Sequence, residues 1–89
     1  MTSVTGIIKN SAGFHLRPAQ LFVEKANEFK AKVMVKNEKG MSVAGKSILG
    51  LMTLGVECGS QIIIETEGED EVSAAQALLD LINSKFGEE

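Results

Sequence analysis

The sequence contains few of the cysteine, histidine and aromatic residues from which small proteins build metal sites and enclosed active sites. Its 89 residues include one cysteine, one histidine, one proline, four phenylalanines and neither tyrosine nor tryptophan. A chain of this length buries too little surface to leave room for a large internal cavity. We therefore expect a single domain over residues 1–89 with an aliphatic core, and we do not expect an enzyme that encloses its substrate.

The lone cysteine, Cys58, excludes an intramolecular disulfide and a cysteine-based metal site. The single histidine has no further ligand residues near it in sequence, so we expect neither a bound metal nor a cofactor. One thiol fits a reducing compartment. The chain lacks a signal-peptide pattern at its start, and no segment approaches the roughly 20 apolar residues of a membrane span. We expect a cytoplasmic protein without membrane insertion.

Charge is distributed unevenly along the chain. The formal net charge is −3, but residues 1–46 sum to +5 and residues 47–89 to −8. The basic half suggests an acidic partner, although ordinary solvated helix and strand faces would produce the same split. No aromatic residues are interleaved with the lysines and the chain is acidic as a whole, so we do not expect nucleic-acid binding.

Strand-like segments occur four times. Apolar residues within short stretches, two of them bounded by turn residues, predict strands over residues 2–9, 31–37, 41–43 and 60–67. In the last of these, Ile62, Ile64 and Thr66 fall on one side. Alternation of this kind indicates a sheet with one buried and one solvated face.

Helical spacing predicts three further elements. Apolar positions of a first helix, over residues 16 to about 28, are Ala19, Phe22, Val23 and Ala26. Ser47 precedes a brief apolar run and is predicted to cap a short middle helix. A last helix is predicted from inward positions at Val72, Ala75, Leu79, Ile82 and Phe86, with acids at residues 69–71 at its positive end.

The order of these elements, β-α-β-β-α-β-α, predicts the α+β class. The expected architecture is a two-layer, open-faced sandwich, in which a four-stranded antiparallel sheet is covered by helices on one face.

The only histidine, His15, lies in residues 13–19, GFHLRPA, between a predicted turn and the first predicted helix. Free N–H groups and the positive end of the dipole at a helix N-terminus favour an anion. The guanidinium of Arg17 is shaped to bind phosphate oxygens. These features suit a transient phosphohistidine. The alternatives are an incidental histidine, a metal ligand without partners, and a catalytic triad without a nucleophile-elbow motif.

Residues 13–19 resemble the active-site motif of the HPr family, the histidine-containing phosphocarriers of the bacterial phosphoenolpyruvate:sugar phosphotransferase system. Residues 46–55, KSILGLMTLG, are similar to the second signature of the family, and residues 67–71, EGEDE, resemble the entry to its last helix. The resemblance extends over essentially the whole chain.

The resemblance implies specific roles. In the family, a phosphoryl group passes from phosphoenolpyruvate to enzyme I, then to Nδ1 of the motif histidine, then to a histidine of an enzyme IIA domain. His15 would be the acceptor and donor, and Arg17 would stabilise the phosphoryl group. The N–H groups of Leu16 and Arg17 would complete the anion site. We expect a monomer with enzyme I and enzyme IIA as its partners.

Ser47 has two compatible interpretations. The residues alone favour a helix N-cap, worth about 1 kcal/mol. The resemblance adds regulatory phosphorylation by a serine kinase/phosphorylase, which changes binding to partners such as a transcriptional regulator. Phosphate at an N-cap is electrostatically compatible with the helix, so modification would alter partners without unfolding the protein.

We expect a partner-docking surface next to the histidine on the first and middle helices. Its predicted residues are Leu16, Gln20, Leu49 and Met52, whereas Ile48 is predicted to belong to the core by spacing. A shallow apolar patch suits a carrier that meets several partners.

Two rival functions remain open at this point. The paralogous carrier of the nitrogen-related phosphotransferase system shares the histidine motif. A non-catalytic regulatory interaction module of the same fold, with an incidental histidine, is the rival from a different class.

Overall fold

The chain forms an alternation of strands and helices close to the predicted one. The structure, a computed structural model, describes residues 1–10 and 13–87. The elements, in chain order, are β1 (Thr2–Ile7), α1 (Leu16–Ala26), β2 (Lys32–Lys36), β3 (Ser42–Ala44), α2 (Ile48–Thr53), β4 (Gln61–Glu67), α3 (Glu71–Asn83) and a 3₁₀ turn (Lys85–Gly87).

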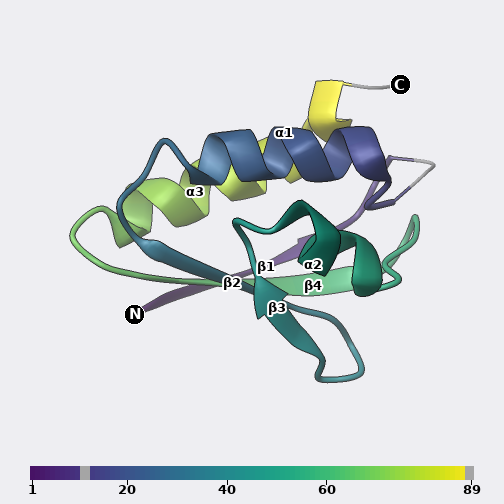
Figure 1. The fold of residues 1–89 in the computed structure, drawn as a ribbon, viewed down its shortest axis with the longest axis horizontal. Coiled ribbons are helices and arrows are strands. Elements are labelled where there is room, and N and C mark those ends of the chain that lie inside the picture. The colour runs from purple at the N-terminus through teal and green to yellow at the C-terminus, as the bar shows by residue number, and fades with distance from the viewer. Residues whose placement is uncertain (11–12, 88–89) are drawn as a thin grey trace.

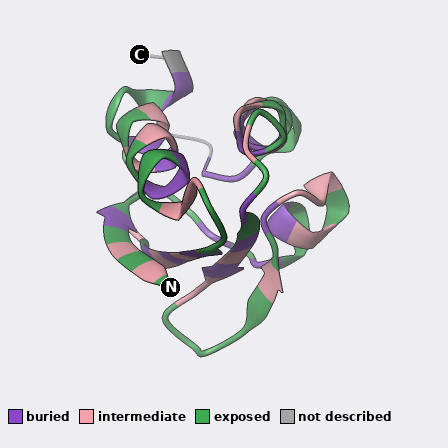
Figure 2. Ribbon diagram, turned by 90° about the vertical axis from the view of Figure 1, so that its left-hand side faces the viewer, coloured by how far each residue is buried: buried purple, intermediate pink, exposed green. Residues whose placement is uncertain are grey.

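The sheet in the described part of the chain has four antiparallel strands in the order β1-β4-β2-β3. Figures 1 and 2 together show α1 and α3 next to each other over one face of this sheet, with α2 below α1 in the view of Figure 1 and the other face left open. The predicted α+β, two-layer open-faced architecture is confirmed. No helix in residues 1–10 or 13–87 has both the length and the apolar character to cross a membrane.

The helix-covered face of the sheet carries the core. On β4, Ile62, Ile64 and Thr66 are buried, as the alternation predicted, and Val33 and Val35 of β2 face the same side. Successive strand side chains point to opposite faces, so every second residue enters the core. Figure 2 shows the buried positions gathered between the helices and the sheet.

The buried side of α1 agrees with its predicted spacing, but α3 differs. Its buried residues are Ala74, Ala75, Leu78 and Ile82. Leu79 is only half-buried and the predicted inward residue Val72 is 68% exposed. This segment is so rich in apolar residues that two neighbouring faces of the helix both fit the 3.6-residue spacing. The spacing therefore does not determine whether Leu78 or Leu79 is buried.

Phe86 enters the core as predicted, but not from a continuous helix. Helix α3 ends at Asn83, and Phe86 lies in the following 3₁₀ turn with a φ of 56°. Its side chain is 4% exposed. The aromatic residue therefore packs against the body of the protein after the chain has left α3.

The residues before and after α2 are bonded to residues at opposite ends of α1. Just before α2, the Lys46 ammonium donates to the carbonyl oxygen of Phe29, which follows α1, at 3.0 Å. Just after α2, the carbonyl oxygen of Val56 accepts from the N–H of Phe14, which precedes α1, at 3.3 Å. The end of α2 is thereby placed against the segment that leads to His15.

The acidic residues at the start of α3 make contacts that the sequence pattern did not predict. The Asp70 carboxylate accepts from the N–H groups of Lys30 at 2.9 Å and Ala31 at 2.8 Å, which joins α3 to the entry of β2. The N–H of Lys30 is the main cause that lowers the pKa of Asp70. Asp70 thus occupies the N-cap position without a side-chain bond to its own helix.

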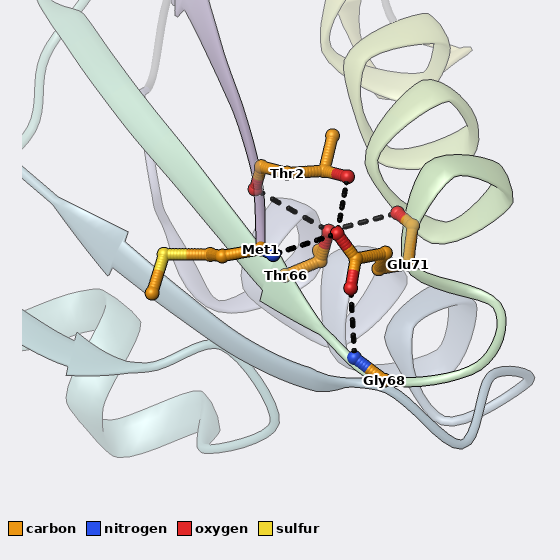
Figure 3. A network of polar contacts seen from close by, with 5 residues as sticks. All are labelled: Met1, Thr2, Thr66, Gly68 and Glu71. Carbon is orange, nitrogen blue, oxygen red and sulfur yellow. Dashed lines mark hydrogen bonds and ion pairs between the residues drawn. The ribbon is translucent and has the colours of Figure 1, made fainter.

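Glu71 joins the start of α3 to the start of β1 (Figure 3). Its carboxylate accepts from the Thr2 hydroxyl at 2.7 Å and the Gly68 N–H at 3.2 Å, and lies 3.1 Å from the amino group of Met1. These contacts, the Thr2 hydroxyl first, lower the pKa of Glu71 to about 2. The charged carboxylate is therefore the form that the fold stabilises.

Candidate functional site

His15 lies at the N-cap position of α1 with its side chain exposed. Its backbone is extended, with φ −78° and ψ −179°, and its imidazole makes no capping hydrogen bond. Among the described residues, no side-chain hydrogen bond involves the ring. The imidazole is therefore presented to solvent at the start of the helix, where a larger protein can reach it.

The first turn of α1 leaves two backbone donors without an intrahelical partner. The first helical bond runs from the N–H of Ala19 to the carbonyl oxygen of His15, at 3.0 Å. Pro18 has no N–H, so the free donors are those of Leu16 and Arg17. Free donors of this kind and the positive end of a helix dipole both favour a negative charge, as the prediction for the residues beside His15 requires.

Arg17 adds a positive charge at the same place. Its side chain is exposed, and none of the ion pairs between described residues involves it. A guanidinium can bind two phosphate oxygens at once. The predicted phosphate-binding residues, His15, Leu16 and Arg17, are thus consecutive residues at one helix end.

The segment before His15 is held against the loop that follows α2. Gly13 has a φ of +65°, and a Cβ atom added to it would lie 2.2 Å from the carbonyl oxygen of Val56. The next residue, Phe14, donates its N–H to that same oxygen. Only glycine fits such an approach with a left-handed backbone.

The Phe14 side chain fixes the segment from the core side. It is 5% exposed, and its ring centroid lies 5.5 Å from that of Phe22 on α1 and 5.8 Å from that of Phe86. Edge-to-face contacts of this type favour a defined ring orientation. His15 therefore follows a residue that is fixed in position, although His15 is itself exposed.

Asn10 is completely buried next to this segment, and no motif in the sequence marked it as a functional residue. Its side-chain amide donates to the carbonyl oxygen of Gly13 at 2.7 Å. An asparagine before a glycine-containing turn is a recognised turn signal, but its burial could not be read from the pattern.

Ser47 has the capping role that the sequence predicted. Its hydroxyl accepts from the N–H of Gly50 at 3.0 Å, and α2 begins at the next residue. The side chain is half-buried. Ser47 lies before the start of α2, whereas the segment that leads to His15 contacts the loop after the end of α2.

The predicted docking residues are all exposed on α1 and α2. The exposed fractions are 51% for Leu16, 74% for Leu49 and 41% for Met52, and Gln20 is also exposed. Leu16 and Gln20 are four residues apart on α1, and Leu49 and Met52 three apart on α2, so each pair shares a helix face.

The prediction that Ile48 belongs to the core needs correction. Ile48 is half-buried at the margin of the core, whereas Leu51 is completely buried. A helix of only six residues buries a narrow part of its surface, and in α2 the buried position is that of Leu51.

Comparisons with known proteins identify the family of the chain. A family model described as "PTS HPr component phosphorylation site" matches residues 2–84. The phosphocarrier protein HPr of Neisseria meningitidis is 48% identical over 82 residues, covering 91% of this chain and 90% of the relative. HPr of Borreliella burgdorferi is 43% identical over 84 residues, covering 94% and 96%.

A solved structure has the same fold over the whole chain. It is HPr-C-His from Thermoanaerobacter tengcongensis, with a TM-score of 0.94 and 48% identity, and the match covers 100% of this chain and 99% of that one. Relatives named phosphocarrier protein NPr, from Proteus mirabilis, and HPr-like protein Crh, from Halalkalibacterium halodurans, are 37% and 41% identical. The family model and these relatives span nearly the entire sequence, and the chain belongs to the HPr family of phosphocarrier proteins.

Proposed function

We propose that this protein is the phosphocarrier of a phosphoenolpyruvate-dependent sugar phosphotransferase system. His15 accepts a phosphoryl group from enzyme I and passes it to a histidine of an enzyme IIA domain. The observation that supports this most directly is the exposed imidazole of His15 beside two free N–H groups and the Arg17 guanidinium. Relatives named HPr are 35–48% identical to this chain and the relative named NPr is 37% identical, so sequence identity does not separate the sugar pathway from the nitrogen-related one, which stays the alternative.

The site suits a reversible transfer. Nδ1 of His15 attacks the phosphorus atom of the donor phosphohistidine, so that a new P–N bond forms while the donor P–N bond breaks. The N–H groups of Leu16 and Arg17, with the Arg17 guanidinium, bind the phosphoryl oxygens. In an exposed position each contribution is modest, about 1 kcal/mol or less for the helix end. A carrier must release what it accepts, and such weak binding allows release.

Partner recognition is assigned to the exposed residues on the two neighbouring helices. Leu16, Gln20, Leu49 and Met52 form the docking surface for enzyme I and enzyme IIA. Leucine and methionine side chains adapt to different partner surfaces at little cost. We propose that the protein acts as a monomer in the cytoplasm, although one HPr of Thermoanaerobacter tengcongensis has been solved as a dimer.

Ser47 is the proposed site of regulatory phosphorylation. A kinase/phosphorylase would add a phosphate with a charge of about −1.5 to −2 at the start of α2. The helix end tolerates this charge, but an acidic partner surface facing the docking residues does not. Modification therefore weakens transfer from enzyme I and favours other partners, such as a transcriptional regulator, without unfolding the domain.

The decisive experiment is incubation with enzyme I and phosphoenolpyruvate, followed by mass spectrometry before and after acid treatment. We expect one acid-labile phosphoryl group on the wild type and none on His15→Ala. Ser47→Ala is the matched control and should be labelled to the same extent. An unlabelled wild type would contradict the carrier function and favour a regulatory interaction module.

A further inference from the structure

A completely buried amide lies directly behind the segment that carries His15. Asn10 follows β1, and its side chain is 0% exposed. Its Nδ2 atom donates to the carbonyl oxygen of Gly13 at 2.7 Å, the only side-chain hydrogen bond that Asn10 makes among the described residues. The Asn10 carbonyl oxygen accepts from the N–H of Gly13 at 3.3 Å, so the two residues are joined by a pair of bonds.

The amide bond between Gly13 and Phe14 is held on both sides. Its carbonyl oxygen accepts from Asn10, and its N–H donates to the carbonyl oxygen of Val56. A planar peptide group whose N–H and carbonyl oxygen are both hydrogen-bonded is held against rotation about the chain direction. The Phe14 ring is also fixed, between Phe22 and Phe86. The bonds that remain free to rotate are therefore those that lie after this peptide, between it and the imidazole of His15.

Stability alone explains Asn10 poorly. Its Oδ1 atom is buried without a hydrogen-bond partner among the described residues. The other buried polar residue of the core, Thr66, instead donates its hydroxyl to the carbonyl oxygen of Glu71 at 2.8 Å. A buried amide whose NH2 group is hydrogen-bonded but whose oxygen is not contributes little to stability, because the oxygen gave up its hydrogen bonds to water without gaining a partner in the protein. Its bonded end, however, acts two residues from His15.

We propose that Asn10 is a positioning residue for phosphoryl transfer at His15. By holding the Gly13–Phe14 peptide, it aims the imidazole and the free N–H groups of Leu16 and Arg17 at the same phosphoryl group. Asn10 touches neither the phosphoryl group nor the partner. This role rests on the proposed carrier function of His15.

The test measures single-turnover transfer from phosphorylated enzyme I to Asn10→Leu and Asn10→Ala at increasing carrier concentration. Asn10→Leu keeps the branched shape of the side chain, although leucine is larger, and Asn10→Ala removes the amide without adding volume; neither variant introduces a charge. Displacement of reacting groups by a fraction of an ångström to 1 Å lowers rates by up to about 100-fold. We expect the maximal rate to fall by about 10- to 100-fold. The half-saturating concentration should stay unchanged, because the docking residues are untouched.

Thr66→Val is the matched control, since it removes a buried polar group at the far end of β4. It should lose stability and yet transfer at the wild-type rate, with all proteins measured at a temperature where circular dichroism shows them folded. In addition, the ¹⁵N chemical shifts of the His15 ring should move in both Asn10 variants and not in Thr66→Val.

A measurement on the wild type removes the dependence on folding of the variants. A scalar coupling across the hydrogen bond between Asn10 Nδ2 and the Gly13 carbonyl carbon should be visible by nuclear magnetic resonance, and its absence would overturn the proposal. Folded Asn10 variants with the wild-type maximal rate, or with a loss confined to the half-saturating concentration, would also overturn it. A wild type that accepts no phosphate would instead defeat the proposed function.

Discussion

Gly13 and Val56 touch backbone to backbone. A Cβ atom on Gly13 would stand 2.2 Å from the Val56 carbonyl oxygen and 2.8 Å from Cα of Glu57. The same oxygen accepts the N–H of Phe14. The segment that leads to His15 thus packs directly on the loop after α2. The absence of a side chain at position 13 allows the two backbones to come this close.

Gly13→Ala should therefore be far more destabilising than Gly55→Ala. Both glycines have left-handed φ angles, +65° and +66°, but an added Cβ at Gly55 meets nothing within 4 Å. Each substitution costs about 1–2 kcal/mol for the backbone conformation. The clash at Gly13 adds about 1–3 kcal/mol of overpacking. Urea unfolding measures the difference, and equal free energies of unfolding for the two variants would contradict the close approach.

Removal of the Ser47 hydroxyl should destabilise the protein by about 1 kcal/mol, because the N–H of Gly50 loses its cap. Ser47→Asp should retain most of this stability, since aspartate is an equally good N-cap and its charge suits the helix end. Thermal and urea unfolding of both variants give the comparison.

Ser73→Ala provides the control, because Ser73 is exposed on α3. It should change the free energy of unfolding little. The folded Ser47→Asp protein should accept phosphate from enzyme I more slowly than the wild type. Unchanged transfer would argue against a regulatory role for Ser47.

Much of the sheet and of the site could be predicted from the sequence because the determinants are local. Alternation placed Ile62, Ile64 and Thr66 on the buried face, and Ser47 could be recognised from the apolar run that follows it. The histidine, the arginine and the helix start are adjacent in sequence, so their proximity followed from the helix alone.

Features that depend on distant contacts could not be predicted. The inward side of α3 depends on how it packs on β1, where Gly6 faces Leu79 and Ile82, and the sequence offered two equally apolar phases. The position of the Gly13–Phe14 peptide, to which Asn10 is bonded, depends on Val56, more than 40 residues away along the chain. The sequence around Asn10 does not indicate that the loop after α2 packs on the segment that leads to His15.

Stability should decrease in acid partly through Glu71. Its pKa is lowered from 4.5 to about 2 in the folded protein, so the unfolded chain binds a proton more readily. The stabilisation is complete above pH 4.5 and is lost as the pH falls from 4.5 toward 2. The melting temperature of Glu71→Gln should therefore fall less between pH 5 and 2.5 than that of the wild type.

Glu69→Gln is the control for this experiment, because it removes an exposed carboxylate from the same turn. Its melting temperature should follow the wild-type dependence on pH. If Glu71→Gln did so as well, the contacts with Thr2, Gly68 and the Met1 amino group would not stabilise the charged carboxylate.

Arg17→Gln should slow phosphoryl transfer while leaving the fold intact, because the Arg17 side chain is exposed and unpaired among the described residues. An ion pair in such an exposed position contributes up to about 1 kcal/mol, equivalent to a rate loss of up to about 5-fold. Arg17→Lys keeps the charge without the forked donor and should show an intermediate rate. Lys30→Gln removes the same charge beyond the opposite end of α1 and should leave the rate unchanged in single-turnover transfer from enzyme I. An equal loss in Lys30→Gln would show that net charge, and not the position of the guanidinium beside His15, controls the reaction.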